Sequence, residues 1–381
     1  MLAAMSSRLG VRSLAREALF PAFGAATMAA LFFGVDGAPA APVDEAVWRE
    51  DLPTILAYRL SGLALAAARA SGVTLPADVQ QQIKSTYTGE TMNGMRIETL
   101  AVQVAQAFEK QSIPMLVVKG PTIARFYPEP TLRPFHDVDV LVAPSLFDAA
   151  ARVLASLGFV EHDDLMQPRA YFNRSCREAV NLVRADNTSV DLHHHVPPWI
   201  WGARLSFDRL CARSTPMALD RGDIPALSNE HTLLLAALHL LSDKSRPGAT
   251  PIIWRDVIAI AAACDPAAVA TEARALRLDW LLALVLAELP SWAQPAALVS
   301  ALGTPQVSAP DRARARLLLP PGIGSKMLAH AFRIPAPNAM AFVAGYLLPS
   351  RAYLRHELGA RASYPQWWRH AVRNAGEALQ D

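Results

Sequence analysis

The chain has 381 residues, enough for two or three domains and a sizeable core. Hydrophobic residues make up 52% of it and charged residues 18%, which indicates a globular protein and excludes global disorder. The formal net charge is +2, and no long block of like charges occurs, so the sequence gives no strong signal for nucleic-acid binding. The three cysteines lack CxxC spacing, which argues against a disulfide framework or structural zinc and favours a reducing, cytoplasmic location.

The N-terminal segment allows two interpretations. Residues 18–35 carry no charge and follow Arg8, Arg12 and Arg16, a pattern that a signal peptide or membrane anchor would share. Pro21 and Gly24 interrupt this stretch, and much of the rest is alanine. We therefore favour a buried helical hairpin and expect no membrane association.

In chain order, the patterns predict an α+β fold. Residues 1–112 form a helical N-terminal region, with apolar residues at helical spacing over 46–70 and 95–110. Residues 113–215 form an α/β core with strands at 114–119 and 136–142, a helix at 144–157 and a hairpin of 179–184 with 189–195. Residues 216–381 form a helical C-terminal domain, with predicted helices at 229–241, 254–263, 267–289 and 338–347.

Two aspartates stand on one face of the second predicted strand. Side chains alternate across a strand, so Asp137 and Asp139 share one face and Val138, Val140 and Val142 share the other. The valine face can pack into a core. Two like charges side by side repel, and a divalent cation resolves that repulsion. Carboxylate oxygens are ligands that Mg²⁺ prefers.

The later strand repeats the pattern. Asp191, His193 and His195 share one of its faces. If the two strands are neighbours, Asp191 completes a cluster of three carboxylates, and such a cluster can hold a pair of metal ions. His193 would be a partner of a ligand, a ligand itself or a proton shuttle.

Arg133 precedes the Asp-x-Asp strand in a proline-flanked loop. Its guanidinium could clamp a phosphate through two parallel hydrogen bonds. The alternative is a structural salt bridge.

These motifs together resemble a known family. The stretches LVVKGPTIARFY (116–127), LRPFHDVDVLV (132–142) and VDLH (190–193) are similar to the uncharacterised bacterial nucleotidyltransferase-like family, within the DNA polymerase β-like superfamily. Members of that family often occur near lasso peptide and other peptide natural-product genes. The resemblance covers most of residues 50–360.

The resemblance implies a nucleotidyltransferase-type mixed sheet flanked by helices, and a Mg²⁺ or Mn²⁺ site formed by Asp137, Asp139 and Asp191. Standard superfamily members carry Gly-Ser in the turn before the Asp-x-Asp strand, where this chain has Lys119 and Gly120. Gly120 allows close backbone approach to a phosphate, and Lys119 offers it a point charge.

The functional hypothesis is a metal-dependent nucleotidyltransferase that moves a nucleotide monophosphate (NMP) from a nucleoside triphosphate (NTP) to a peptide or small-molecule acceptor in natural-product biosynthesis. In it, Asp137, Asp139 and Asp191 are catalytic. Two alternatives stay open: a non-catalytic scaffold that binds a nucleotide or peptide, and a phosphoryl transferase that acts on a peptide hydroxyl.

Overall fold

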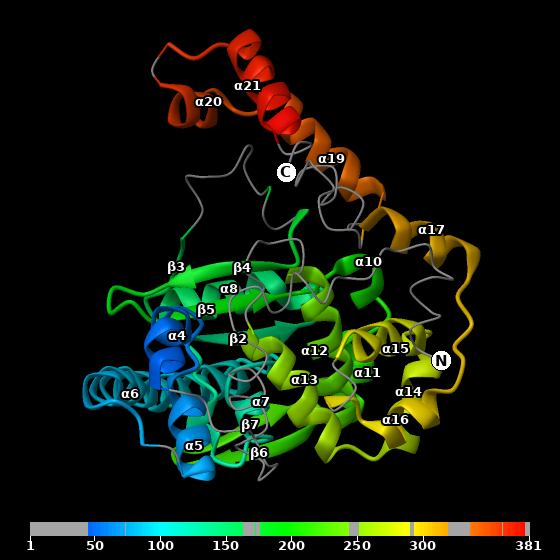
Figure 1. The fold of residues 1–381 in the computed structure, drawn as a ribbon. Coiled ribbons are helices and arrows are strands. Elements are labelled where there is room, and N and C mark those ends of the chain that lie inside the picture. The colour runs from blue at the N-terminus through cyan, green and yellow to red at the C-terminus, as the bar shows by residue number, and fades with distance from the viewer. Residues whose placement is uncertain are drawn as a thin grey trace.

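A mixed sheet with helices on both sides forms the centre of the molecule in the computed structural model (Figure 1). The structure describes residues 45–72, 74–162, 172, 176–243, 251–289, 293–318, 336–359 and 361–377. The predicted N-terminal hairpin at 18–35 lies outside the described residues. The α+β fold class is confirmed.

The sheet has seven strands in the order β3-β4-β5-β2-β1-β7-β6. Strand β2 pairs with β5 in parallel and with β1 in antiparallel orientation, so the Asp-x-Asp strand lies at the centre of the sheet. The strands are β1 (Met115–Val117), β2 (Asp137–Val142), β3 (Val160–Glu161), β4 (Ala179–Val183), β5 (Ser189–His193), β6 (Thr215–Leu219) and β7 (Gly222–Ala226).

The sheet continues beyond the segment from which strands were predicted. Strands β6 and β7 form an antiparallel hairpin, and β7 pairs in parallel with β1 through Val117 and Ala226. Pro216 lies on β6, the edge strand, where a missing N–H is tolerated. Pro225 lies opposite it on β7, which pairs with β1 only at Ala226. The division of the chain at residue 215 stays a prediction, while the sheet itself extends to residue 226.

One face of the sheet is covered by two long apolar helix faces. Helix α6 (Ala77–Lys110) contacts β1, β2 and β7, and α8 (Phe147–Ser156) contacts β5. The three valines of β2 point into this core, as predicted from the alternation. The aspartates of β2 therefore face the other side, where the remaining helices pack.

That other side is covered mainly by helices that precede β1 and helices that follow β7 in the sequence. A large second core joins Leu116, Val118 and Leu141 of the sheet region to the N-terminal and C-terminal helices. These helices are α4 (Glu45–Ala57), α5 (Ser61–Ser71), α12 (Asn229–Asp243), α13 (Pro251–Ala263), α14 (Pro266–Ala275), α15 (Asp279–Glu288) and α16 (Ala296–Leu302). The short helix α7 (Pro121–Ala124) follows β1 in the sequence, and α10 (Trp199–Gly202) and α11 (Phe207–Ala212) lie between β5 and β6.

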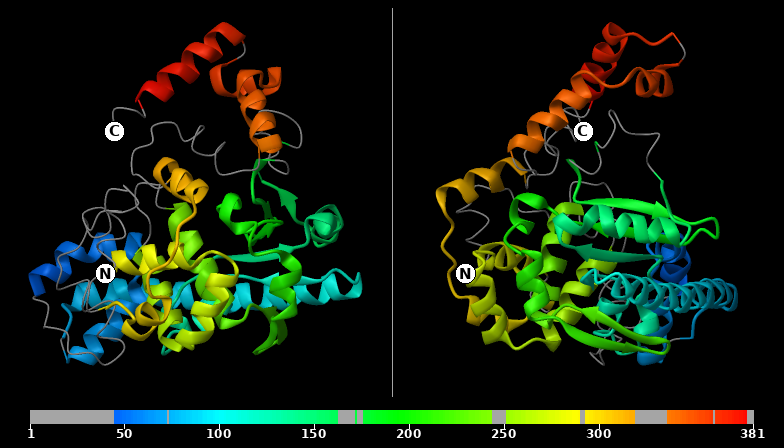
Figure 2. Two further views of the ribbon diagram at one scale, coloured as in Figure 1. Left: turned by 90° about the vertical axis from the view of Figure 1, so that its right-hand side faces the viewer. Right: turned by 180° about the vertical axis from the view of Figure 1, so that it is seen from behind.

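The last described helices run away from the sheet. They are α17 (Ala309–Leu318), α19 (Ala336–Leu347), α20 (Arg351–Leu358) and α21 (Tyr364–Glu377), and two further views show the same separation (Figure 2). Tyr353, Leu354 and Trp367 give α20 and α21 a small core of their own. Among the described residues, no helix combines the length and the apolar character needed to cross a membrane.

Two helices predicted as continuous are each broken by an arginine with positive φ. The prediction over 46–70 becomes α4 and α5, separated at Arg59 (φ 58°), and that over 267–289 becomes α14 and α15, separated at Arg277 (φ 56°). Arginine rarely adopts this conformation, so neither break is visible as a glycine or proline signal. The apolar spacing continues across both breaks because each helix pair packs into the same core.

Helix α6 contains a buried acid, Glu90, which should make the folding stability depend on pH. Glu90 is 8% exposed, and its Oε2 atom has no hydrogen-bond partner. Burial raises the pKa of Glu90 to about 7, opposed in part by the charge of Arg59. The unfolded chain loses this proton near its ordinary pKa of 4.5, so folding stability falls as the pH rises from there to 7.

Removing this acid should therefore stabilise the protein above neutrality. We expect Glu90→Gln to raise the unfolding free energy by roughly 2–3 kcal/mol at about pH 8 and by little at about pH 4. Chemical denaturation at both pH values measures this. Glu109→Gln, at an exposed position of the same helix, is the control. An equal effect of Glu90→Gln at both pH values would contradict the assignment.

Candidate metal centre

The parallel pairing of β2 and β5 brings the two acidic strands together in register. Asp139 lies directly opposite Asp191, and Leu141 lies opposite His193. Side chains opposite each other in neighbouring strands lie on the same face. The expectation that the two strands are neighbours is therefore correct, and it places both carboxylates on the face away from α6 and α8.

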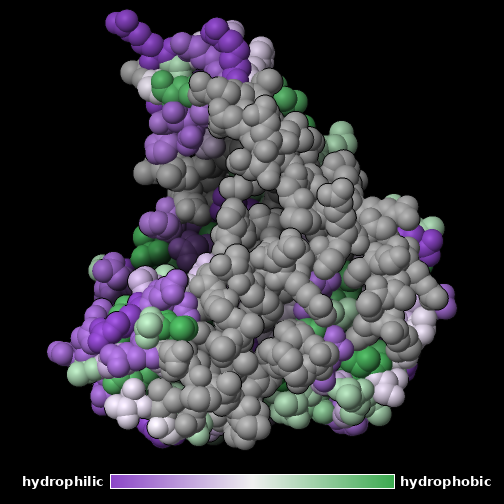
Figure 3. Space-filling view, in the orientation of Figure 1, coloured by the Kyte–Doolittle hydropathy of each residue, from purple (hydrophilic) through white to green (hydrophobic). Residues whose placement is uncertain are grey.

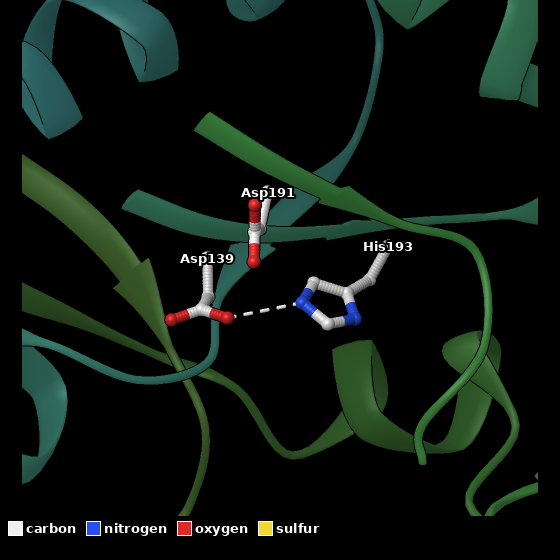
Figure 4. Close-up of side chains that lie close together, drawn as sticks. All are labelled: Asp139, Asp191 and His193. Atoms are coloured by element: carbon white, nitrogen blue, oxygen red, sulfur yellow. Dashed lines mark hydrogen bonds and ion pairs between the residues drawn. The ribbon is translucent and has the colours of Figure 1, made fainter. Parts of the chain in front are cut away.

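Three side chains of this face converge on one point. One oxygen each from Asp139 and Asp191 and one ring nitrogen of His193 all lie within 4.8 Å of one another. The Asp191 carboxylate points toward the space between Asp139 and His193 (Figure 4). Asp139 and His193 are buried, and Asp191 is half-buried. Among the described residues this is the only group of at least three His, Cys, Asp or Glu side chains with metal-binding spacing.

Asp139 is the most heavily bonded member of the group. Its Oδ1 atom accepts hydrogen bonds from Lys119 Nζ and from His193 Nε2, each at 3.0 Å. Burial would raise the pKa of Asp139, but the Lys119 ammonium and the His193 hydrogen bond together hold it well below its usual value. Asp139 therefore stays ionised, as a metal ligand must be.

Lys119 is enclosed by the acidic cluster. Burial alone would lower the pKa of Lys119, but the negative charges of Asp139, Asp137 and Asp191 outweigh this and raise it. Its side chain is 13% exposed and points at Asp139. From the sequence, Lys119 was predicted to offer its charge to a phosphate. In the structure its ammonium is paired with the carboxylate of Asp139.

Asp137 stands apart from the convergent group, although it shares their face. It contributes no atom to the cluster formed by Asp139, Asp191 and His193. Burial, together with the charges of Asp139 and Asp191, raises the pKa of Asp137 to about 7. A cation near these carboxylates would relieve that repulsion. Its role as a metal ligand stays a prediction.

Gly120 makes the turn between β1 and α7. It adopts φ 63° and ψ −119°, a backbone conformation that side-chain-bearing residues rarely take. A Cβ atom at this position would approach the ring of Phe135 and the carbonyl oxygen of Asp137 at 3.5 and 3.7 Å. The glycine therefore gives the turn its shape beside the acidic strand, and a role in nucleotide binding stays a prediction.

Arg133 forms the structural salt bridge that the sequence left as an alternative. Its Nη2 and Nε atoms donate to the two carboxylate oxygens of Asp256 at 2.9 and 3.2 Å, and Tyr127 Oη donates to the same carboxylate at 2.7 Å. Arg133 and Asp256 side chains are 11% and 3% exposed. The guanidinium of Arg133 thus links the loop before β2 to helix α13, and both of its hydrogen bonds to Asp256 are formed within the chain.

Sequence reasoning missed one residue that holds the cluster in place. Asn181 on β4 lies opposite Asp191 in the sheet, and its Nδ2 atom donates to Asp191 Oδ1 at 2.6 Å. Partners of this kind orient a ligand and strengthen metal binding. The only signal in the sequence was the polar residue within the otherwise apolar strand AVNLV.

Loss of this partner should weaken binding of a divalent ion. We expect Asn181→Ala to lower Mn²⁺ affinity by about 10- to 100-fold, the usual cost of losing a group that orients a ligand. Isothermal titration calorimetry measures it, with the exposed Gln103→Ala on α6 as control. Unchanged affinity in Asn181→Ala would show that Asp191 needs no orientation from β4.

The donors fit a divalent cation. Two carboxylates and an imidazole converge from adjacent strands at the centre of a rigid sheet, with Asn181 behind one of them. The fold and site thus define an α+β protein with a carboxylate–histidine cluster that could hold a divalent ion.

Comparison with known proteins then gives the family. A family model described as uncharacterised nucleotidyltransferase matches residues 44–294, so the chain belongs to this nucleotidyltransferase family. No curated protein matches the chain. Among solved structures it is similar to an antigenic nucleotidyltransferase-like protein from Paracoccidioides brasiliensis, at 18% identity and a TM-score of 0.32, covering 52% of this chain and 96% of that one.

Proposed function

We propose that this protein is a divalent-metal-dependent nucleotidyltransferase that moves an NMP from an NTP to a hydroxyl of a peptide or small molecule. The observation that carries the proposal is the register of β2 and β5, which sets Asp139 opposite Asp191 with His193 beside them. Membership of the nucleotidyltransferase family supports it.

In the proposed reaction the acceptor oxygen attacks the α-phosphorus of the NTP. The bond from that oxygen to phosphorus forms, the bond from the α-phosphorus to the bridging oxygen breaks, and pyrophosphate leaves with the electron pair and the acceptor proton. A divalent ion, when bound, would neutralise triphosphate charge and favour the deprotonated acceptor. No nucleophilic side chain is required.

The residues of this chain hold and orient the reactants. Asp139 and Asp191 would hold the ion, and Asn181 fixes the orientation of Asp191. Lys119 adds a positive charge at the floor of the site, which favours a polyanionic substrate. The Arg133–Asp256 pair fixes the loop that leads into Asp137.

One observation favours a second candidate, a scaffold without catalysis. The ammonium of Lys119 already compensates Asp139, so the cluster is partly neutralised by the chain itself. A protein that had lost catalysis could retain such a site as a binding surface for a nucleotide or peptide. Its ligand binding would then be independent of divalent ions.

A thermal-shift panel distinguishes these two functions. ATP, GTP, CTP and UTP are tested with and without Mg²⁺ or Mn²⁺ on the wild type and on Asp139→Asn. Ligand at about 100 times its dissociation constant adds about 2.7 kcal/mol to native stability, enough to raise the melting temperature measurably. The proposal predicts a divalent-dependent rise with an NTP that is lost in the variant. A rise without divalent ions would support the scaffold, and no rise with any nucleotide would contradict NTP use.

A further inference from the structure

Helices α19, α20 and α21 form an arm that the proposed function does not use. The arm extends away from the sheet that carries the acidic cluster (Figure 2). The residues matched by the family model end at residue 294, so the arm lies beyond them. The role of the arm must therefore be inferred from its own surface.

Large apolar side chains are exposed on this arm. Four of the seven large hydrophobic side chains that are exposed in the described part of the chain belong to it: Met340, Leu347, Leu348 and Trp368. Leu347 and Leu348 are 52% and 50% exposed, and Trp368 is 45% exposed. Single exposed hydrophobic residues are ordinary, whereas several together mark an interaction surface.

Hydrogen bonds bring three of these residues into one patch. The indole Nε1 of Trp368 on α21 donates to the carbonyl oxygen of Leu347, the last residue of α19, at 2.7 Å. Tyr364 Oη donates to the carbonyl oxygen of Pro349 at 2.9 Å. The start of α21 is thus held against the segment that follows α19. Leu347, Leu348 and Trp368 together form what we call the leucine–tryptophan patch.

The packing of the arm does not require this patch to be apolar. Trp367 points inward: it is 5% exposed, and its ring lies 5.6 Å from that of Tyr353 between centroids. Trp368, the next residue, belongs to no hydrophobic core among the described residues. The small core of α20 and α21 therefore explains the first of these tryptophans and leaves the second for another role.

The arm also carries an excess of positive charge. Residues 336–370 contain four arginines and a single acid, Glu357, whose Oε1 atom lies 3.2 Å from His356 Nδ1. The arginines are all exposed: Arg351, Arg355, Arg361 and Arg369. Among the described residues, none of the four has a carboxylate partner. Their guanidinium groups are thus available to an anionic partner near the exposed apolar side chains.

A lipid surface suits this combination better than a folded protein does. A standard protein interface buries about 800 Å² on each partner, more than three partly exposed side chains can supply. A membrane surface requires no complementary shape, because protruding apolar side chains enter the boundary between headgroups and acyl chains. Indole is well suited to that boundary, since it is apolar with one polar N–H. Guanidinium groups pair with lipid phosphates.

We propose that the arm binds the surface of an anionic lipid membrane. The leucine–tryptophan patch enters the headgroup region, and the four arginines of the arm pair with lipid phosphates. This inference goes beyond the proposed function and does not rest on it. It departs from the expectation of no membrane association, which was drawn from the N-terminal segment and not from the arm.

The first test is co-sedimentation of the full-length protein with vesicles, without nucleotide or divalent ions. Vesicles of phosphatidylcholine alone are compared with an equal mixture of phosphatidylcholine and phosphatidylglycerol. We expect binding to the mixed vesicles to be at least about 10-fold tighter and to weaken as salt is added. No sedimentation with the mixed vesicles would overturn the inference.

Substitutions then locate the contact. Leu347→Gln combined with Leu348→Gln should weaken binding to the mixed vesicles by about 10-fold or more, because less apolar surface enters the lipid. Met92→Gln combined with Met95→Gln, at 66% and 59% exposed positions of α6, is the matched control and should change it little. Equal binding by the two double variants would place the contact elsewhere and refute the assignment to the arm.

The arginines are tested in the same way. Arg351→Gln combined with Arg369→Gln should weaken binding to the mixed vesicles by about 5-fold for each charge removed. Lys84→Gln combined with Lys110→Gln, at exposed positions of α6, is the control for the same loss of net charge. A similar loss in both double variants would show a general charge effect and not a contact made by the arm.

Tryptophan fluorescence reports the insertion itself. Among the described residues Trp368 is the only exposed tryptophan, so lipids brominated on the acyl chain should quench the wild type and quench Trp368→Phe far less. Equal quenching of both would contradict insertion at the patch. Dimers in solution that the leucine substitutions abolish, without vesicle binding, would show a second copy of the chain as the partner instead. Vesicle binding without turnover of an NTP would keep this inference and refute the proposed function.

Discussion

Replacing Asp139 with asparagine should lower turnover by about 10³-fold, because it removes an anionic ligand of the ion at the reacting phosphate. Loss of several kcal/mol of charge stabilisation in the transition state corresponds to that factor, at about 1.4 kcal/mol for each tenfold change. The geometry supports the choice of this residue, because Asp139 Oδ1 accepts hydrogen bonds from both Lys119 and His193. Pyrophosphate release per chain measures the effect.

The fold should survive this change. Asparagine is of similar size, and it relieves the repulsion between Asp139 and the neighbouring acids, which offsets part of the lost pairing with Lys119. Asp223→Asn, at an exposed position on β7 of the same sheet, is the matched control and should retain full turnover. Activity of Asp139→Asn within about threefold of the wild type would refute the proposed metal ligand.

Replacing Asp256 with asparagine should cost about 3 kcal/mol of stability or more, because it leaves Arg133 buried without a charged partner. The carboxylate of Asp256 is 3% exposed and accepts hydrogen bonds from Arg133 and Tyr127. Burial would lower the pKa of Arg133, but Asp256 raises it above its usual value, which keeps the arginine charged in the native state. Chemical denaturation measures the loss.

A surface pair provides the comparison. Arg69 and Glu129 lie 3.7 Å apart with both side chains more than half exposed. Pairs of this kind contribute about 0–1 kcal/mol, so Glu129→Gln should change stability by less than that. Similar losses for Glu129→Gln and Asp256→Asn would contradict the claim that the Arg133–Asp256 pair is a structural anchor. In that case the arginine would be available to a substrate.

The alternation of residues in the two acidic strands was sufficient to predict the central part of the site. The valines of β2 are buried against α6 and α8, so the aspartates must face the opposite side. Placing Asp191 beside Asp139 required the strands to be neighbours, which the sequence could only suppose. The observed parallel register shows that they are.

Contacts between distant segments could not be predicted from the same reasoning. Asp256 contacts Arg133 from 123 residues away, on a helix that is apolar apart from Arg255 and Asp256. Asn181 becomes a partner of Asp191 only through the antiparallel register of β4 and β5. In each case the signal was a polar residue in a largely apolar element, and its partner was set by packing.

The strands at one end of the sheet were not predicted from the sequence because they contain prolines. Strands β6 and β7 contain Pro216 and Pro225, and a proline argues against a strand in the interior of a sheet. Only β6 is an edge strand, and β7 pairs with its other neighbour, β1, at the single residue Ala226. The position of a helix in the fold decides which of its faces is exposed. One face of α6 is buried against the sheet, whereas much of the surface around α4 and α6 is hydrophilic (Figure 3). Apolar spacing alone does not show where along a helix a break occurs.

The position of the label on the product shows whether the protein transfers a nucleotidyl group. The protein is incubated with Mn²⁺ or Mg²⁺ and an NTP radiolabelled either at the α- or at the γ-phosphorus, and the products are separated by chromatography. We expect divalent-dependent release of the γ-label as pyrophosphate, with the α-label in a nucleotidyl product or, with water as acceptor, in the NMP. Formation of a nucleoside diphosphate, or no divalent-dependent turnover of any NTP, would contradict it.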